Sequence, residues 1–473
     1  MSKPRPPDGE AAPPSPRAGA GSPLGKAETL RASSSASTDP GLRPLAVLLI
    51  GWTLRWLGVS FYSPYLLLYL HRTLGLGFVS AGLVISGLAL LAPPLSLLGG
   101  GLADRWGRRR MIVGSMTFEA LALTVLATGL SLVSLPLILA GLGASQVCSS
   151  VGVPSTLAYV ADRTTPAQRS QAIAWIRIGI NLGYSGGIAL GGVLLLFLAF
   201  WETAAIATIV VGSGALVSAS LLSPSPRDRR SENAGTVPPR TPPRGWVQAL
   251  AESGRSTAEA LRSLRRNPFL IELGLAGGLS YLMFQQLNFS ISTFGLKSLG
   301  ISYGLVGGAL AVNGITCVLL PLRLPTWAAG RTLTWVGACG AGIIGAGLFG
   351  IGLDGFFRVA TVPIYFLAVL TMSVGECFAT LPPWTLALNL APEAERGAFS
   401  GGIAMSTGLV ASLSGLFAGA ALSIPPNPIA TWSILSAPAV VSVGLYGRLG
   451  ARLGTVQNRV GVPRIEGRGS SEG

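Results

Sequence analysis

Twelve apolar segments, each near the length that crosses a lipid bilayer, constrain this chain more than any other feature. About 20 apolar residues in a helix span the hydrocarbon core of a membrane. A helix suits that environment because it satisfies its backbone hydrogen bonds within one segment. We therefore predict transmembrane helices near 45–70, 78–103, 111–131, 135–160, 170–195, 200–222, 269–295, 302–322, 332–352, 359–386, 397–422 and 428–447.

The composition agrees with an all-α membrane protein. Hydrophobic residues make up 49% of the 473 residues and charged residues only 11%, whereas a soluble domain carries about 25% charged residues. The first 44 residues, rich in Pro, Ser, Ala and Gly, bury too little apolar surface to fold alone. We predict a disordered cytoplasmic tail at 1–44, six-helix bundles at 45–222 and 269–447, a cytoplasmic linker at 223–268 and a cytoplasmic tail at 448–473.

The basic residues are distributed as a membrane topology requires. With both termini in the cytoplasm, 29 of the 34 Lys and Arg residues fall in predicted cytoplasmic segments. The predicted outer loops hold only Arg72, Lys297 and Arg358. Cytoplasmic loops of membrane proteins carry this excess, so the net charge of +15 reflects topology. No Arg-rich segment is interleaved with stacking aromatic residues, and we expect no nucleic-acid partner.

Residues for metal binding or covalent catalysis are scarce. The single histidine is His71, and the four cysteines fall inside apolar segments without metal-ligand spacing. The sequence contains no HExxH or GxxxxGKS/T motif. We therefore expect no enzyme activity, no metal, no cofactor and no built-in ATPase.

Two segments at equivalent positions indicate duplication of a six-helix unit. Pro154-Ser-Thr-Leu-Ala158 ends the fourth predicted helix, and Pro383-Trp-Thr-Leu-Ala387 ends the tenth. Each is followed by a short loop with Pro and Arg and then by a Gly-rich helix. Internal repeats of this kind build many transporters, so the pattern predicts two pseudo-symmetric bundles.

The loop after the second predicted helix is the most specific motif. It reads Gly-x-x-x-Asp-Arg-x-Gly-Arg-Arg from Gly100 to Arg109. Glycine permits close helix approach and a sharp turn, and Asp104 can pair with arginines or face a helix N-terminus. Such contacts would stabilise one of two conformations of the protein and break in the other. The residues expected in this conformational gate are Gly100, Asp104, Arg105, Gly107, Arg108, Arg109, Asp162 and Arg169.

This loop resembles the signature of the major facilitator superfamily, and the resemblance covers roughly residues 45–447. The segment Asp162-Arg-x-x-Pro-x-x-Arg169 agrees with it. The resemblance implies two bundles that alternate access to a central cavity lined by helices 1, 4, 7 and 10. It further implies a small-molecule substrate and, in the drug-efflux branch, proton antiport. In the second half Trp327 stands where the aspartate of the loop would fall.

Glycines line one face of the fifth predicted helix. Small residues at every fourth position let helices pack backbone to backbone in lipid. Their pattern is similar to the motif of the superfamily's exporters, although Ile188 stands where that motif has proline. An uptake or metabolite porter of the same fold is therefore an alternative. The glycines expected to pack closely are Gly183, Gly187, Gly191 and Gly192.

Charged residues inside the membrane are costly and mark functional sites. Four stand well inside predicted helices: Arg55, Glu119, Arg177 and Glu376. Arg55 shares a face with glycines and Tyr62, a stripe that predicts a cavity wall. Arg55 and Glu376 are the first expectation for substrate contact or ion coupling, and a structural ion pair is the alternative. For Glu119 and Arg177 a structural role is favoured.

Polar residues of the seventh predicted helix join the expected site. Amides in lipid either hold helices together or meet a polar substrate. The residues expected at the substrate or coupled ion are Arg55, Tyr62, Glu119, Gln285, Gln286, Asn288 and Glu376. We predict a monomeric secondary transporter in a prokaryotic plasma membrane that exports a small molecule in exchange for protons. A membrane sensor that no longer transports is an alternative from another class.

Overall fold

A computed structural model describes residues 42–225, 258–259, 261–353, 361–392, 395–424, 427–454 and 458. Chain contacts separate Met1–Arg43 from the unit Pro44–Gly473, and the fold described below is that of the second unit. Residues 42–44 of the predicted N-terminal tail are described and begin a helix, whereas the rest of that tail, most of the linker and the end of the C-terminal tail lie outside the described residues.

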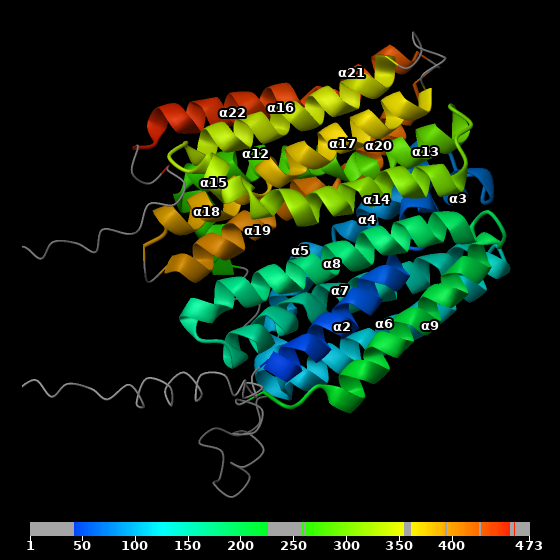
Figure 1. Cartoon of the computed structure of the whole chain (residues 1–473), viewed down its shortest axis with the longest axis horizontal. Helices are drawn as coiled ribbons and strands as arrows, with labels where there is room; N and C mark the ends of the chain where they lie inside the picture. The colour runs from blue at the N-terminus through cyan, green and yellow to red at the C-terminus, as the bar shows by residue number, and fades with distance from the viewer. Residues whose placement is uncertain are drawn as a thin grey trace, which may run out of the picture. The chain divides into compact units, whose positions relative to one another are not determined.

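The first half of the unit, residues 44–225, contains seven long helices and two short ones (Figure 1). Several breaks fall at prolines, which remove a backbone donor and kink a helix. In chain order the elements are α2 (Leu42–Val59), η1 (Ser63–Tyr65), α3 (Leu66–Arg72), α4 (Phe78–Ala89), α5 (Ala92–Trp106), α6 (Arg108–Ser131), α7 (Leu135–Arg163), α8 (Pro166–Leu194) and α9 (Phe200–Leu221).

The second half, residues 261–458, repeats this pattern of long and broken helices. Its elements are α12 (Pro268–Phe284), η3 (Gln285–Leu287), α13 (Ser290–Lys297), α14 (Tyr303–Leu319), η4 (Leu320–Leu322), α15 (Leu324–Ala328), α16 (Leu333–Gly352), α17 (Thr361–Ala379), α18 (Leu381–Leu390), α19 (Arg396–Ser412), α20 (Ser414–Leu422), α21 (Pro428–Ser436) and α22 (Pro438–Arg452). The last helix ends at Arg452, beyond the predicted end at 447.

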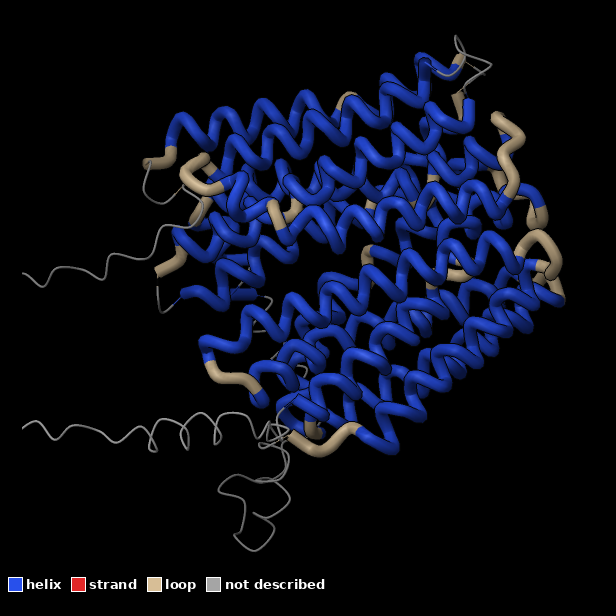
Figure 2. The backbone as a smooth tube through the Cα atoms, viewed as in Figure 1, coloured by secondary structure: helices blue, strands red, loops and turns tan. Residues whose placement is uncertain are grey.

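The described residues form helices without β-sheet (Figure 2), which confirms the all-α prediction for this part of the chain. Ten of the described helices are long and apolar enough to cross a membrane. They coincide with ten of the twelve predicted segments. The other two segments correspond to α8, whose inner face carries polar residues, and to α12 with η3 and α13, where the helix is broken.

The face of α8 that carries the repeated glycines packs against α2. A Cβ atom at Gly183 would overlap the backbone carbonyl of Thr53, and one at Gly187 would overlap that of Leu57. Gly191 lies against the carbonyl of Phe61, two residues after the end of α2. Gly192 points instead at the carbonyl of Tyr303 in the second half. The absence of side chains therefore lets α8 approach helices of both halves.

The two halves meet at one end, which we call the closed end. There α4 packs on α20, because Gly82 lies against the backbone of Gly415. The backbone N–H of Leu416 also donates to Ser86 Oγ at 2.8 Å. Toward the other end the ribbons of the two halves diverge in Figure 1.

Candidate functional site

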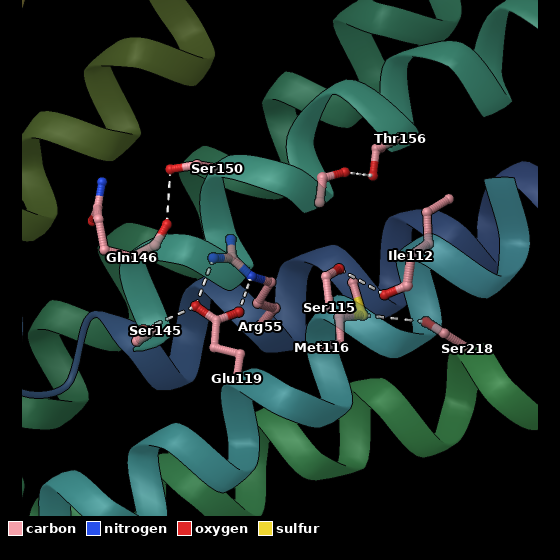
Figure 3. A network of polar contacts seen from close by, with 11 residues as sticks. Arg55, Ile112, Ser115, Met116, Glu119, Ser145, Gln146, Ser150, Thr156 and Ser218 are labelled. Carbon is pink, nitrogen blue, oxygen red and sulfur yellow. Dashed lines mark hydrogen bonds and ion pairs between the residues drawn. The ribbon is translucent and has the colours of Figure 1, made fainter. Parts of the chain in front are cut away.

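A buried ion pair joins α2 to α6 inside the first half (Figure 3). Arg55 Nε and Nη2 donate to the two carboxylate oxygens of Glu119, the second at 2.7 Å. The two side chains are only 3% and 1% exposed. Ser145 Oγ from α7 donates to Glu119 Oε1 at 3.3 Å. The pair of hydrogen bonds between the Arg55 guanidinium and the Glu119 carboxylate is bidentate, and such pairs are among the strong charge-assisted hydrogen bonds.

Packing around Arg55 differs from the predicted cavity wall. Its guanidinium lies 5.0 Å from the ring centroids of both Trp52 and Trp56. Tyr62, on the same stripe, is 3% exposed. The glycines of the stripe pack on α9, where Gly58 lies against the carbonyl of Ala207. The sequence periodicity identified the face correctly, but a neighbouring helix covers it, so Arg55 lies in the interior of the first half.

A small cavity lies where α8 of the first half faces the second half. Its volume is about 90 Å³, below the roughly 300–1,000 Å³ of sites that hold a whole drug-sized ligand. Arg177 is the lining residue from the first half, and Glu376 on α17 is its oppositely charged counterpart. The remaining lining residues are Gly277, Ser280, Tyr281, Phe284, Ile344, Ala379, Thr380, Pro383, Trp384 and Thr407.

Glu376 receives hydrogen bonds from neutral groups of its own half. Asn313 Nδ2 donates to Glu376 Oε2 at 2.7 Å, and Cys317 Sγ donates to the same oxygen at 3.3 Å. Asn313 Nδ2 also lies 3.1 Å from Ser373 Oγ, which fixes the amide. Within the described part of the chain, Glu376 forms no ion pair with a basic residue. It is half-buried and reaches the cavity.

Arg177 is exposed and forms no hydrogen bond or ion pair with any described residue. The sequence favoured a structural role for it, whereas the structure places it on the cavity opposite the second half. Tyr281 and Trp384 line the same cavity and are 41% and 45% exposed. Thr407 Oγ1 is buried at the cavity without a hydrogen-bond partner among the described residues.

The predicted polar residues of the seventh segment hold helices together. Gln286 is fully buried, donates to the carbonyls of Leu282 and Ser414, and accepts from Ser290 Oγ. Asn288 Oδ1 accepts from Tyr184 Oη at 2.6 Å, a bond between the two halves. Gln285 Oε1 lies 3.5 Å from Asn288 Nδ2. The cavity lining around Arg177 and Glu376 does not include these three amides.

The described residues of the predicted gate bind within the first half. Gly107 has a φ of 90°, a backbone conformation that favours glycine, and it makes the turn from α5 to α6. Arg108 forms an ion pair with Asp162, so the start of α6 is tied to α7.

Two further arginines of the gate bind backbone carbonyls. Arg109 donates to the carbonyls of Leu222 and Ala219 at 2.5 and 2.6 Å, and Arg169 donates to that of Ala161 at 3.2 Å. The three described gate arginines, Arg108, Arg109 and Arg169, therefore each bind a carboxylate or carbonyl groups near a helix end. The side chains of Asp104 and Arg105 and the surroundings of Gly100 lie outside the described part of the structure.

Sequence reasoning missed part of the cavity. Trp384 stands in the repeated segment that ends the tenth predicted helix, and that repeat was the signal available for it. Thr407 and Cys317 gave no signal, because a hydroxyl or thiol in an apolar segment is usually a packing residue. No group of three His, Cys, Asp or Glu side chains suited to a metal ion occurs among the described residues.

Comparisons with known proteins agree with the fold. The family model "Major Facilitator Superfamily" matches residues 48–415. A Na⁺, Li⁺, K⁺/H⁺ antiporter of Planococcus maritimus is 26% identical over 76% of this chain and 84% of its own length. The quinolone resistance protein NorA of Staphylococcus aureus is 27% identical over 32% of this chain and 38% of its own length.

Solved structures share the architecture at low identity. A POT family transporter in complex with a thioalcohol-conjugated peptide superposes with a TM-score of 0.69 at 15% identity, over 87% of this chain and 96% of that one. The human organic anion transporter MFSD10 gives 0.55 at 18% identity, over 86% and 99% of the two chains. With the family model spanning most of the sequence, the chain belongs to the Major Facilitator Superfamily and is a multi-pass membrane transporter.

Proposed function

We propose that the protein is a secondary active transporter that exports a small molecule by alternating access in exchange for protons. The names of relatives support export and proton coupling, since they include a cation/H⁺ antiporter and a quinolone resistance protein. The proposal includes twelve transmembrane helices, cytoplasmic termini and a place in the plasma membrane of a prokaryote. In it, transport rather than covalent chemistry is the whole activity.

The observation that carries proton coupling is the position of Glu376. Its carboxyl group reaches the cavity between the halves and is bound only by neutral donors among the described residues. A carboxyl group without a fixed counter-ion can take up and release a proton without breaking an ion pair. Glu119, by contrast, is held by Arg55 in the interior of the first half. We therefore assign the coupled proton to Glu376.

The predicted topology indicates which side of the membrane the closed end faces. The loops at the closed end, which include His71 and Lys297, are those predicted to face the outside. Lys297 Nζ lies 3.0 Å from His71 Nε2 and 4.4 Å from the ring centroid of Phe78, so this contact joins the halves. The structure then corresponds to an inward-facing state. Transport would require these contacts to separate while the opposite end closes.

The test measures export of a fluorescent quinolone in proteoliposomes with an imposed pH gradient. We expect the gradient to accelerate transport in the wild type and to have no effect in Glu376→Gln. Glu272→Gln is the matched control, because Glu272 is an acid of the same half that pairs with Arg452 at the surface. A Glu376→Gln protein that still responds to the gradient would show that the proton binds elsewhere.

Uptake is the second candidate function, and Ile188 favours it. In the exporters of the superfamily, proline is expected at this position of the glycine motif, whereas Ile188 is 2% exposed in α8 and continues the helix. The same vesicles decide between the two. Transport of the quinolone with the proton flux indicates uptake, and transport against it indicates export. Binding without transport in either direction would favour a sensor.

A further inference from the structure

We propose that Arg177 binds an anionic group of the transported molecule, so that the substrate is an organic carboxylate or similar anion with an aromatic or apolar body. The inference rests on the proposed function only in taking the cavity as the transport site. It concerns which chemical class enters that site.

The state of Arg177 is the first argument. A cation inside a membrane protein is costly, and such residues either pair with an opposite charge or face a water-filled cavity on a substrate pathway. Arg55 is paired with Glu119, and Arg108 with Asp162. Arg177 forms no such direct pair among the described residues; it faces Glu376 across the cavity and lies near the middle of the 29-residue helix α8. A guanidinium presents forked donors that match a carboxylate, and an anionic ligand would supply the missing partner.

The opposite wall of the cavity is the second argument. Tyr281 and Trp384 line it and are 41% and 45% exposed overall, and aromatic rings in a cavity lining suit an apolar ligand body. Thr407 Oγ1 is a buried hydroxyl without a described partner, and it can donate to a ligand oxygen. The cavity of about 90 Å³ has room for a charged head group, while the body would extend along the rings.

The charges of the site limit the ligand further. Arg177 and Glu376 sum to zero when both are ionised, so a bound anion needs one more positive charge. Either a proton on Glu376 supplies it, or the ligand is a zwitterion whose ammonium group faces Glu376. Both cases share an anionic group on Arg177. A purely cationic ligand would be repelled by Arg177.

Such a ligand would also connect the two halves. Arg177 belongs to the first half, whereas the other lining residues belong to the second. A molecule that binds the guanidinium with its anionic end and the rings with its body contacts both. Its binding would therefore favour closure of the halves around it.

The test uses three probes with one aromatic body: 2-naphthoate, 2-naphthylmethylammonium and the zwitterion 2-naphthylalanine. Their affinities for the purified full-length protein are measured by titration calorimetry without a membrane gradient. We expect naphthoate or naphthylalanine to bind at least about tenfold more tightly than the ammonium probe, since a charged hydrogen bond contributes this much. The wild-type comparison needs no variant and therefore does not depend on the folding of one.

Variants locate the anion. Arg177→Gln should weaken binding of the anionic probes about 10- to 100-fold, Arg177→Lys should weaken it less, and Arg452→Gln at the surface should leave it unchanged. Glu376→Gln distinguishes a simple anion from a zwitterion. It should weaken the binding of naphthylalanine, whose ammonium group would face Glu376, and leave the binding of naphthoate unchanged.

Three results would overturn the inference. In the first, the ammonium probe binds the wild type as tightly as the anionic probes do. In the second, neither anionic probe binds at millimolar concentration. In the third, a folded Arg177→Gln protein keeps the wild-type affinities. Loss of proton coupling in the vesicle assay with anion binding intact would contradict the proposed function alone. Proton-coupled transport with preference for the cation would contradict this inference alone.

Discussion

Replacing the Arg55–Glu119 pair by apolar residues tests whether it is structural. Removing one partner from a buried ion pair leaves an uncompensated charge and costs about 3–5 kcal/mol of unfolding free energy. Arg55→Met should lie near the upper value, because Glu119 then keeps only the hydroxyl of Ser145. Glu119→Leu should lie near the lower value, because two tryptophan rings at 5.0 Å still attract the guanidinium, each by about 0.5–2 kcal/mol.

The double variant carries the decisive measurement. With both charges gone, the site becomes apolar among apolar neighbours, and such replacements are often neutral or stabilising. We expect Arg55→Met with Glu119→Leu to lie within about 2 kcal/mol of the wild type, far from the sum of the single changes. Unfolding is followed by tryptophan fluorescence in mixed micelles of increasing denaturing detergent.

A surface pair in the second half provides the control. Arg452 and Glu272 are 55% and 18% exposed at a distance of 2.9 Å. The same comparison of two single variants with the double variant, made on this pair, should give a coupling energy below about 1 kcal/mol, since water screens exposed pairs. If the buried double variant is as unstable as its worst single variant, the structural reading is refuted. A stable double variant that no longer transports the quinolone would also refute it, by showing that Arg55 or Glu119 takes part in transport directly.

Two further predictions concern the closed end. Gly82→Ala should push α4 away from the backbone of Gly415 and favour opening of that end. Distances between spin labels across it should lengthen, whereas Gly87→Ala, which has open space around it, should leave them unchanged. Lys297→Met removes the contact with His71 and should change the same distances in the same direction, but by less, because an exposed polar contact contributes below about 1 kcal/mol. Unchanged distances in Gly82→Ala would mean that this contact does not hold the end closed.

Local signals were enough to predict the helices, because apolar length and helix formation are properties of single segments. The segment at 170–195 corresponds to α8, and those at 78–103 and 397–422 correspond to pairs of helices divided by short breaks. The break at Gln285–Leu287 has no proline in it. Tertiary hydrogen bonds of Gln286 fix its conformation there, and a segment read alone does not contain them.

The site depends on contacts that a one-dimensional pattern does not specify. The sequence correctly singled out four charges inside helices, but their partners lie far along the chain. Arg55 and Glu119 are 64 residues apart, and Asn313 and Glu376 are 63 apart. Periodicity showed that Arg55 and Tyr62 share a face, but it did not show that α9 covers part of that face. For the same reason it gave no means of placing Arg177 on a cavity.

The two halves share a frame but use charge differently, and this difference has a consequence for coupling. In the first half an ion pair joins α2 to α6 in the interior, whereas in the second half the buried contact between α12 and α22 is made by two hydroxyl groups, Ser280 and Ser442. Among the described residues, Glu376 is the charge placed deep in the second half, and the cation facing it, Arg177, belongs to the first. We expect their attraction to act between the halves rather than within one. Because a proton on Glu376 removes that attraction, its protonation state would change how strongly the halves hold together.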